Sequence, residues 1–96
     1  MPNLTPFDMA DYLDDDVTIA EYLSLAAEDE DPKMFLRALR TVSRARGMME
    51  LAKDAHMPRE SLYRALSDNG NPSYSTLRKI VTALGYKLQL KPSLQV

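Results

Sequence analysis

The sequence predicts an all-α domain of five helices, built around a helix-turn-helix, with a short C-terminal β-strand. Three observations favour this fold class. Apolar residues recur three and four positions apart over most of the chain, glycine or proline separates successive repeats, and apolar-polar alternation appears only at residues 86–91. A chain of 96 residues has room for one small core and not for a two-lobed cleft.

The first predicted helix begins at Thr18, because Thr18-Ile19-Ala20-Glu21 has the spacing of a capping box. Its apolar stripe falls at i, i+3, i+4 and i+7 and consists of Ile19, Tyr22, Leu23 and Ala26. The stripe ends in the charged residues 28–31.

The second predicted helix has Asp31 as N-cap and Pro32 as its first residue, since proline there gives up only an amide that lacks a partner. Its inward residues are Phe35, Leu39 and Val42. It should end near Gly47.

Residues 48–66 have the layout of a helix-turn-helix. One stripe contains Met48, Leu51, Ala52 and Ala55, and a second contains Leu62, Ala65 and Leu66. The break at residues 56–58 should place His56 at positive φ, which histidine tolerates better than most residues, and the fixed φ of Pro58 should start the next helix.

The fifth predicted helix is capped by Ser73 or Ser75 and ends at Gly85. Its stripe is Leu77, Ile80, Val81 and Leu84. Residues 86–91 then alternate as a strand stopped by Pro92, and this strand needs a partner, either the N-terminal segment or its copy in a second chain. Residues 7–13 fit either a short helix or an extended arm.

The charges divide the chain into two segments at position 31. Residues 1–31 carry ten carboxylates and no Lys or Arg, whereas residues 32–96 carry all twelve basic residues and four acidic ones. We expect residues 1–31 to be an acidic segment that suits a basic protein. Residues 32–96 should be a basic body that suits a phosphate backbone.

Several function classes are disfavoured by composition. The chain has no cysteine and one histidine, so we expect no metal site, no cofactor and no catalytic residues. The acidic clusters at 14–16 and 28–31 lack the spacing of a calcium loop, and nothing positions a nucleophile for a magnesium enzyme. No apolar run approaches a membrane span and the N-terminus is acidic, so we expect a cytoplasmic protein.

The segment ARGMMELAKDAHMPRESLYRALSDNGNPSYSTLRKIVTALG, with the following KLQL, resembles the bacterial addiction-module antidote proteins. These are HigA-like type II antitoxins with a phage-repressor-like helix-turn-helix. The upstream TPFDMADYLDD and AEYLSLAAEDEDPKMFLRAL resemble the same family, so the match covers nearly the whole chain. His56 in place of the common turn glycine and Pro58 in place of a capping serine are departures.

The resemblance implies a partner toxin of the RelE/HigB type, a small basic ribonuclease encoded by the neighbouring gene, and repression of the chain's own operator DNA. Carried over by position, Arg59, Glu60 and Arg64 would read base edges. The residues expected to meet phosphates are Ser61, Tyr63, Asn71, Ser73, Tyr74 and Ser75.

The charge division motivates the remaining predicted contacts. Apolar residues of the acidic segment should anchor the toxin, and these are Phe7, Tyr12, Leu13 and Tyr22. One short recognition helix reads few base pairs, so we expect a homodimer, with Tyr86, Leu88 and Leu90 as its candidate interface.

Two other functions remain open from the sequence. A phage-type regulator without a toxin partner would have the same DNA chemistry, and the gene neighbourhood distinguishes it. A protein-interaction adaptor would use only the acidic segment, and failure to bind the chain's own upstream DNA would favour it.

Overall fold

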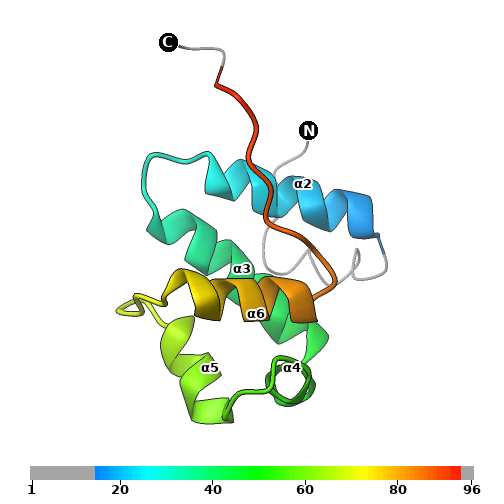
Figure 1. Cartoon of the computed structure of the whole chain (residues 1–96), viewed down its shortest axis with the longest axis vertical. Helices are drawn as coiled ribbons and strands as arrows, with labels where there is room; N and C mark the ends of the chain where they lie inside the picture. Colours follow the sequence, from blue (N-terminus) through cyan, green and yellow to red (C-terminus); the bar gives the residue numbers. More distant parts are fainter. Residues whose placement is uncertain (1–14, 94–96) are drawn as a thin grey trace.

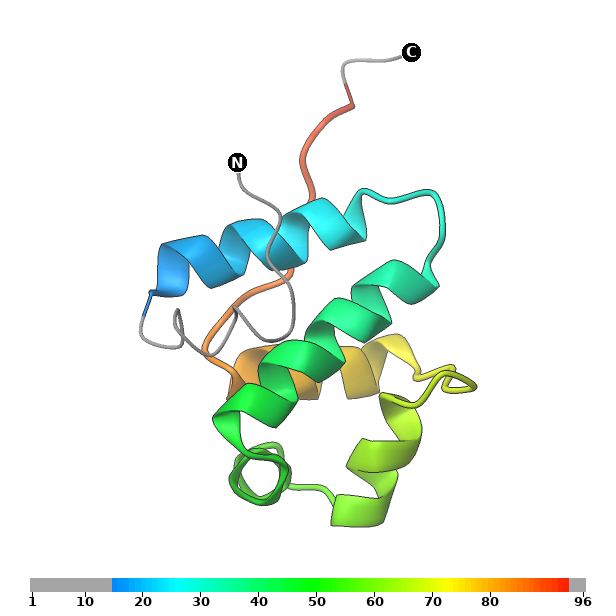
Figure 2. The ribbon, with the colours of Figure 1, turned by 180° about the vertical axis from the view of Figure 1, so that it is seen from behind.

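The computed structural model describes residues 15–93, and within them the only regular elements are five helices. They are α2 (Asp16–Ala27), α3 (Lys33–Arg46), α4 (Met48–Asp54), α5 (Arg59–Ala65) and α6 (Tyr74–Ala83). Figures 1 and 2 show α2 at one end of the molecule and the α4–α5 pair at the other, with α3 and α6 between them. Within residues 15–93, the predicted all-α class and five helices are confirmed.

One hydrophobic core receives side chains from all five helices. The fully buried members include Ile19 of α2, Leu39 of α3, Leu62 of α5 and Ile80 of α6, each 0% exposed. Leu51 and Ala52 of α4 belong to the same cluster. These are the residues that the apolar periodicity selected, because a stripe at helical spacing has to be buried against a neighbouring element.

The described part of the acidic segment does not fold separately from the residues after position 31. Ile19 and Leu23 of α2 pack in the same cluster as the residues of α3 to α6. The division at 31 therefore concerns charge and proposed partners, while residues 16–27 contribute to the common core.

The start of α2 differs from the prediction. Asp15, and not Thr18, is the N-cap: its Oδ1 accepts from the Thr18 amide at 3.1 Å and its Oδ2 accepts from the Thr18 hydroxyl at 2.7 Å. The Thr18 side chain is thus already engaged, and a carboxylate three residues earlier caps the helix one turn sooner. These hydrogen bonds to the charged form hold the pKa of Asp15 below its ordinary value.

The predicted start of α3 is wrong by one residue: Pro32 is the N-cap and Lys33 the first helical residue, where Asp31 and Pro32 were expected. Asp31 lies one residue before the cap, and its Oδ1 accepts from the Lys33 amide at 2.9 Å. The end of α3 at Gly47, with φ of 110°, matches the prediction.

The C-terminal strand is not confirmed. After α6, Gly85 has φ of 96°, and the Gly85 and Tyr86 amides donate to Thr82 O at 2.9 Å and Val81 O at 3.0 Å, which closes α6 with a Schellman motif. Residues 86–93 then run without helix or strand, crossing α2. A strand exists only when another strand completes its ladder, and within residues 15–93 of this single chain none does.

Candidate nucleic-acid interface

The turn between α4 and α5 is fixed by backbone geometry. His56 has φ of 56°, as predicted, and the amides of His56 and Met57 donate to Lys53 O at 3.1 Å and Ala52 O at 3.0 Å. This is again a Schellman motif, which satisfies the last carbonyls of α4. Pro58 is extended, with ψ of 146°, so the chain leaves the turn and starts α5 at Arg59 without a side-chain cap.

The two sides of α5 differ sharply in burial. Leu62 and Ala65 pack into the core together with Leu66, the residue that follows the helix. The sequence predicted that Arg59, Glu60, Tyr63 and Arg64 would be left outward, and all four are exposed. Ser61 is half-buried. The outward side of α5 therefore offers long hydrogen-bonding side chains, whereas the buried residues of α5 are apolar.

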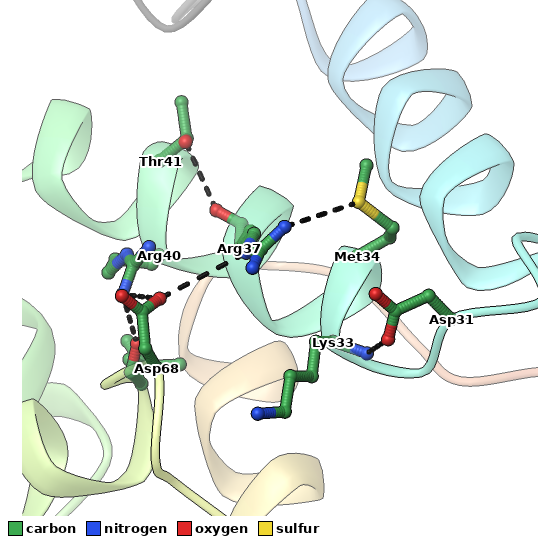
Figure 3. A network of polar contacts seen from close by, with 8 residues as sticks. Asp31, Lys33, Met34, Arg37, Arg40, Thr41 and Asp68 are labelled. Atoms are coloured by element: carbon green, nitrogen blue, oxygen red, sulfur yellow. Dashed lines mark hydrogen bonds and ion pairs between the residues drawn. The ribbon is translucent and has the colours of Figure 1, made fainter.

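Arginines of α3 hold the loop that follows α5 (Figure 3). The Arg40 guanidinium donates to Leu66 O at 3.2 Å and lies 3.0 Å from the Asp68 carboxylate, which Arg37 also approaches at 4.0 Å. Gly70 lies so close to the last carbonyls of α5 that an added Cβ would sit 2.7 Å from Arg64 O. The end of α5 and the following loop are thereby tied to the central helix.

The other residues predicted to contact DNA lie at or just before the beginning of α6. Tyr74, Ser75 and Asn71 are exposed, with Tyr74 65% exposed. Ser73 is instead used locally: its Oγ accepts from the Thr76 amide at 3.2 Å and is hydrogen-bonded to the Thr76 hydroxyl at 3.1 Å. Of the two serines considered as caps, Ser73 is the one chosen.

Two basic residues that the sequence analysis did not select lie beside this surface. Arg78 and Lys79 of α6 are exposed and line a shallow groove together with His56 and Tyr74. The sequence could have indicated them, because they follow Tyr74 by four and five residues along the same predicted helix. They add positive charge next to the turn between α4 and α5.

The residues predicted to bind a toxin or a second copy do not form a single surface among the described residues. Phe7, Tyr12 and Leu13 lie outside the described residues, and Tyr22 is partly buried against the core. Leu88 and Leu90 are 41% and 98% exposed.

Tyr86, the third residue predicted at a dimer interface, is engaged within the chain. Its hydroxyl donates to Asp16 Oδ1 at 3.0 Å and lies 3.4 Å from Arg46. Partial burial and the neighbouring Asp16 raise the pKa of Tyr86.

Metal sites and membrane-spanning helices were also considered for the described residues. Within residues 15–93, no three His, Asp or Glu side chains are gathered so that they would hold a metal ion. None of the helices described there is long and apolar enough to cross a membrane.

Comparison with known proteins gives two matches. The model of the family described as probable addiction module antidote protein matches residues 3–92. A Haemophilus influenzae protein described as "Uncharacterized protein" is 38% identical over 90 residues, which cover 94% of this chain and 93% of that protein. No solved structure matches the chain.

Proposed function

The chain belongs to the family of probable addiction module antidote proteins, and from that premise we propose that it neutralises a toxin and represses its own operator. Family membership supports the antitoxin role. We further propose that the toxin is a small basic ribonuclease of the RelE/HigB type, that residues 32–96 carry the DNA contacts, and that the antitoxin works in the cytoplasm without catalysis of its own.

The observation that carries the DNA part is the outward side of α5. Arg59, Glu60 and Arg64 are exposed on a short helix whose other side is anchored in the core and whose start is fixed by the turn at His56. An α-helix fits the major groove, where arginine can fork onto guanine and glutamate can accept from cytosine. These α5 side chains are not needed to fill the core, and binding to DNA would account for their presence on the surface.

Phosphate contacts are proposed for residues around this helix. Tyr63 and Asn71 are exposed on α5 and in the loop after it, and Tyr74 and Ser75 begin α6, where the first backbone amides of a helix lack intrahelical acceptors. Ser61 is half-buried and the Ser73 hydroxyl is occupied by its cap, so these two would contribute less than the sequence predicted.

The test is a gel shift on the DNA upstream of the gene. Arg59→Ala and Arg64→Ala should each weaken binding to the operator by about 1 to 3 kcal/mol, with a smaller effect on unrelated DNA. Arg44→Ala is the matched control, since Arg44 is also exposed and removing it changes the net charge equally. If both α5 variants bind the operator like the wild type, α5 does not read it.

We also propose that the repressor is a homodimer that reads two half-sites about 34 Å apart. The exposed Leu88 and Leu90 support an interface along residues 86–91, where a second copy would supply the missing strand partner. Light scattering should give the mass of two chains for the wild type. Leu88→Ser/Leu90→Ser should lower this mass, and a monomeric wild type, free and on operator DNA, would contradict the proposal.

A further inference from the structure

The outward side of α2 is unusual for a surface helix. Its inward stripe is satisfied by Ile19 and Leu23, at 0% and 7% exposed, yet Val17 and Leu25 on the outside are 70% and 54% exposed. Exposed aliphatic residues that gather in a concave, acidic surface mark an interaction site more often than scattered ones do.

These residues line a groove of about 670 Å³ between α2 and the segment that follows α6. We call it the α2 groove. Its apolar lining is Val17, Ala20 and Leu25, and its acidic lining is Asp16, Glu21 and Glu28.

The C-terminal segment contacts α2 at two places, one at each end of the groove. At one end, the Tyr86 hydroxyl donates to Asp16 at 3.0 Å, while Arg46 lies 3.5 Å from Asp16 and donates to Leu84 O at 3.2 Å. At the other end, Lys91 lies 2.7 Å from Glu28. A groove formed before binding loses less conformational entropy when a partner is ordered in it.

The charge around the groove selects the kind of partner. Residues 15–31 carry seven carboxylates and no basic side chain, and of these seven only Asp16 and Glu28 form ion pairs with other residues of 15–93. Glu21 and the run 29–31 thus remain available to external cations. Nucleic acid is repelled by this surface, and a second copy placed symmetrically on it would bring the same carboxylates face to face.

We propose that the α2 groove docks a basic segment of the toxin, which inserts an apolar side chain between Val17 and Leu25 and places Lys or Arg side chains against Glu21 and its neighbours. This inference rests on the proposed antitoxin function and specifies its contact surface within the described residues. The aliphatic residues hold the complex together, and the carboxylates chiefly accelerate association.

The test measures binding of the full-length chain to the purified product of the neighbouring gene by biolayer interferometry. Val17→Ser/Leu25→Ser should weaken affinity by about tenfold or more, mainly through faster dissociation. Glu21→Lys should slow association, and the difference from the wild type should shrink as salt rises. Met49→Ser is the matched control, because Met49 is 66% exposed and lies on α4, at the other end of the molecule.

All variants should keep the melting temperature and the operator affinity of the wild type, since none touches the core or α5. Toxin affinity unchanged in Val17→Ser/Leu25→Ser would overturn the inference while leaving the antitoxin function intact. So would a change in self-association, measured by light scattering, at unchanged toxin affinity, because the groove would then join two copies. A wild type that does not bind the neighbouring product would overturn the proposed toxin pairing itself.

Discussion

The α2 and α5 helices show how one core supports two surfaces of opposite character. Both helices bury apolar residues in the same cluster, and they lie at opposite ends of the molecule (Figures 1 and 2). Outward, α5 presents Arg59, Tyr63 and Arg64, whereas α2 presents Val17 and Leu25 among carboxylates. The inward residues decide that both segments are helices, and the outward residues, which folding leaves free, decide which partner each end suits.

The separation also keeps the charges of the two proposed binding surfaces from cancelling. Arg46 of α3 pairs with Asp16 and Lys91 pairs with Glu28, but α5, which carries the exposed Arg59 and Arg64, lies at the opposite end of the molecule from α2 (Figure 1). At physiological ionic strength, screening acts over about 8 Å, so charges at the two ends of the fold interact weakly. Each surface therefore keeps its own sign.

The largest expected effect comes from a substitution in the hydrophobic core against which both α2 and α5 pack. Leu39 of α3 is 0% exposed, and Leu39→Ala should lower the free energy of unfolding by about 2 to 5 kcal/mol through lost burial and the cavity left behind. Urea denaturation followed by circular dichroism should show one transition at lower urea, with α2 and α5 amides losing hydrogen-exchange protection together. Independent loss of protection at the two ends would show that they do not share one cooperative core.

A smaller effect should be confined to the α5 end. Arg40→Ala removes the donor to Leu66 O and the contact to Asp68, and should cost about 1 to 2 kcal/mol because a partly buried carbonyl loses a charged donor. Operator affinity should fall and toxin affinity should not. Arg37→Ala is the control, since its 4.0 Å contact with the same exposed carboxylate contributes little. Equal losses in both variants would mean that net charge, and not the anchored loop, matters.

The cap of α6 provides a finer test of the same end. Ser73→Ala should lower the free energy of unfolding by about 1 kcal/mol, because the Thr76 amide loses its acceptor, and Ser73→Asn should restore most of it. Thermal denaturation gives the comparison. An alanine variant with wild-type melting temperature but weakened operator binding would instead assign Ser73 to a phosphate.

The smallest expected effect lies at the α2 end and depends on pH. The pKa of Asp15 is lowered by its hydrogen bonds to Thr18, so its contribution to stability is present above the ordinary carboxyl value of 3.8 and is lost as the pH falls through the lowered value. Asp15→Asn keeps a cap that does not titrate. The melting temperature of the wild type should therefore drop relative to the variant as the pH is taken below that range, and parallel curves would contradict the assigned cap.

Local sequence alone determined most of the secondary structure. Apolar spacing selected the buried residues of α2 to α6, and His56, Gly47 and Gly85 adopt the positive φ values expected at helix ends. These features depend on residues within one or two turns, where periodicity and backbone sterics act directly. The exposed side of α5 followed from the same pattern, because residues outside the buried stripe must face outward.

Tertiary structure decided what depends on residues far apart in the chain. Arg40 meets the carbonyl of Leu66, and the Tyr86 hydroxyl meets Asp16, across separations of 26 and 70 residues that no local pattern records. The strand expected at residues 86–91 is absent from the described chain because its alternation specifies two faces but not a partner for its ladder. The α2 groove likewise arises only when that segment is fastened across α2, since a sequence states which residues are apolar or acidic, and only the fold brings them around one hollow.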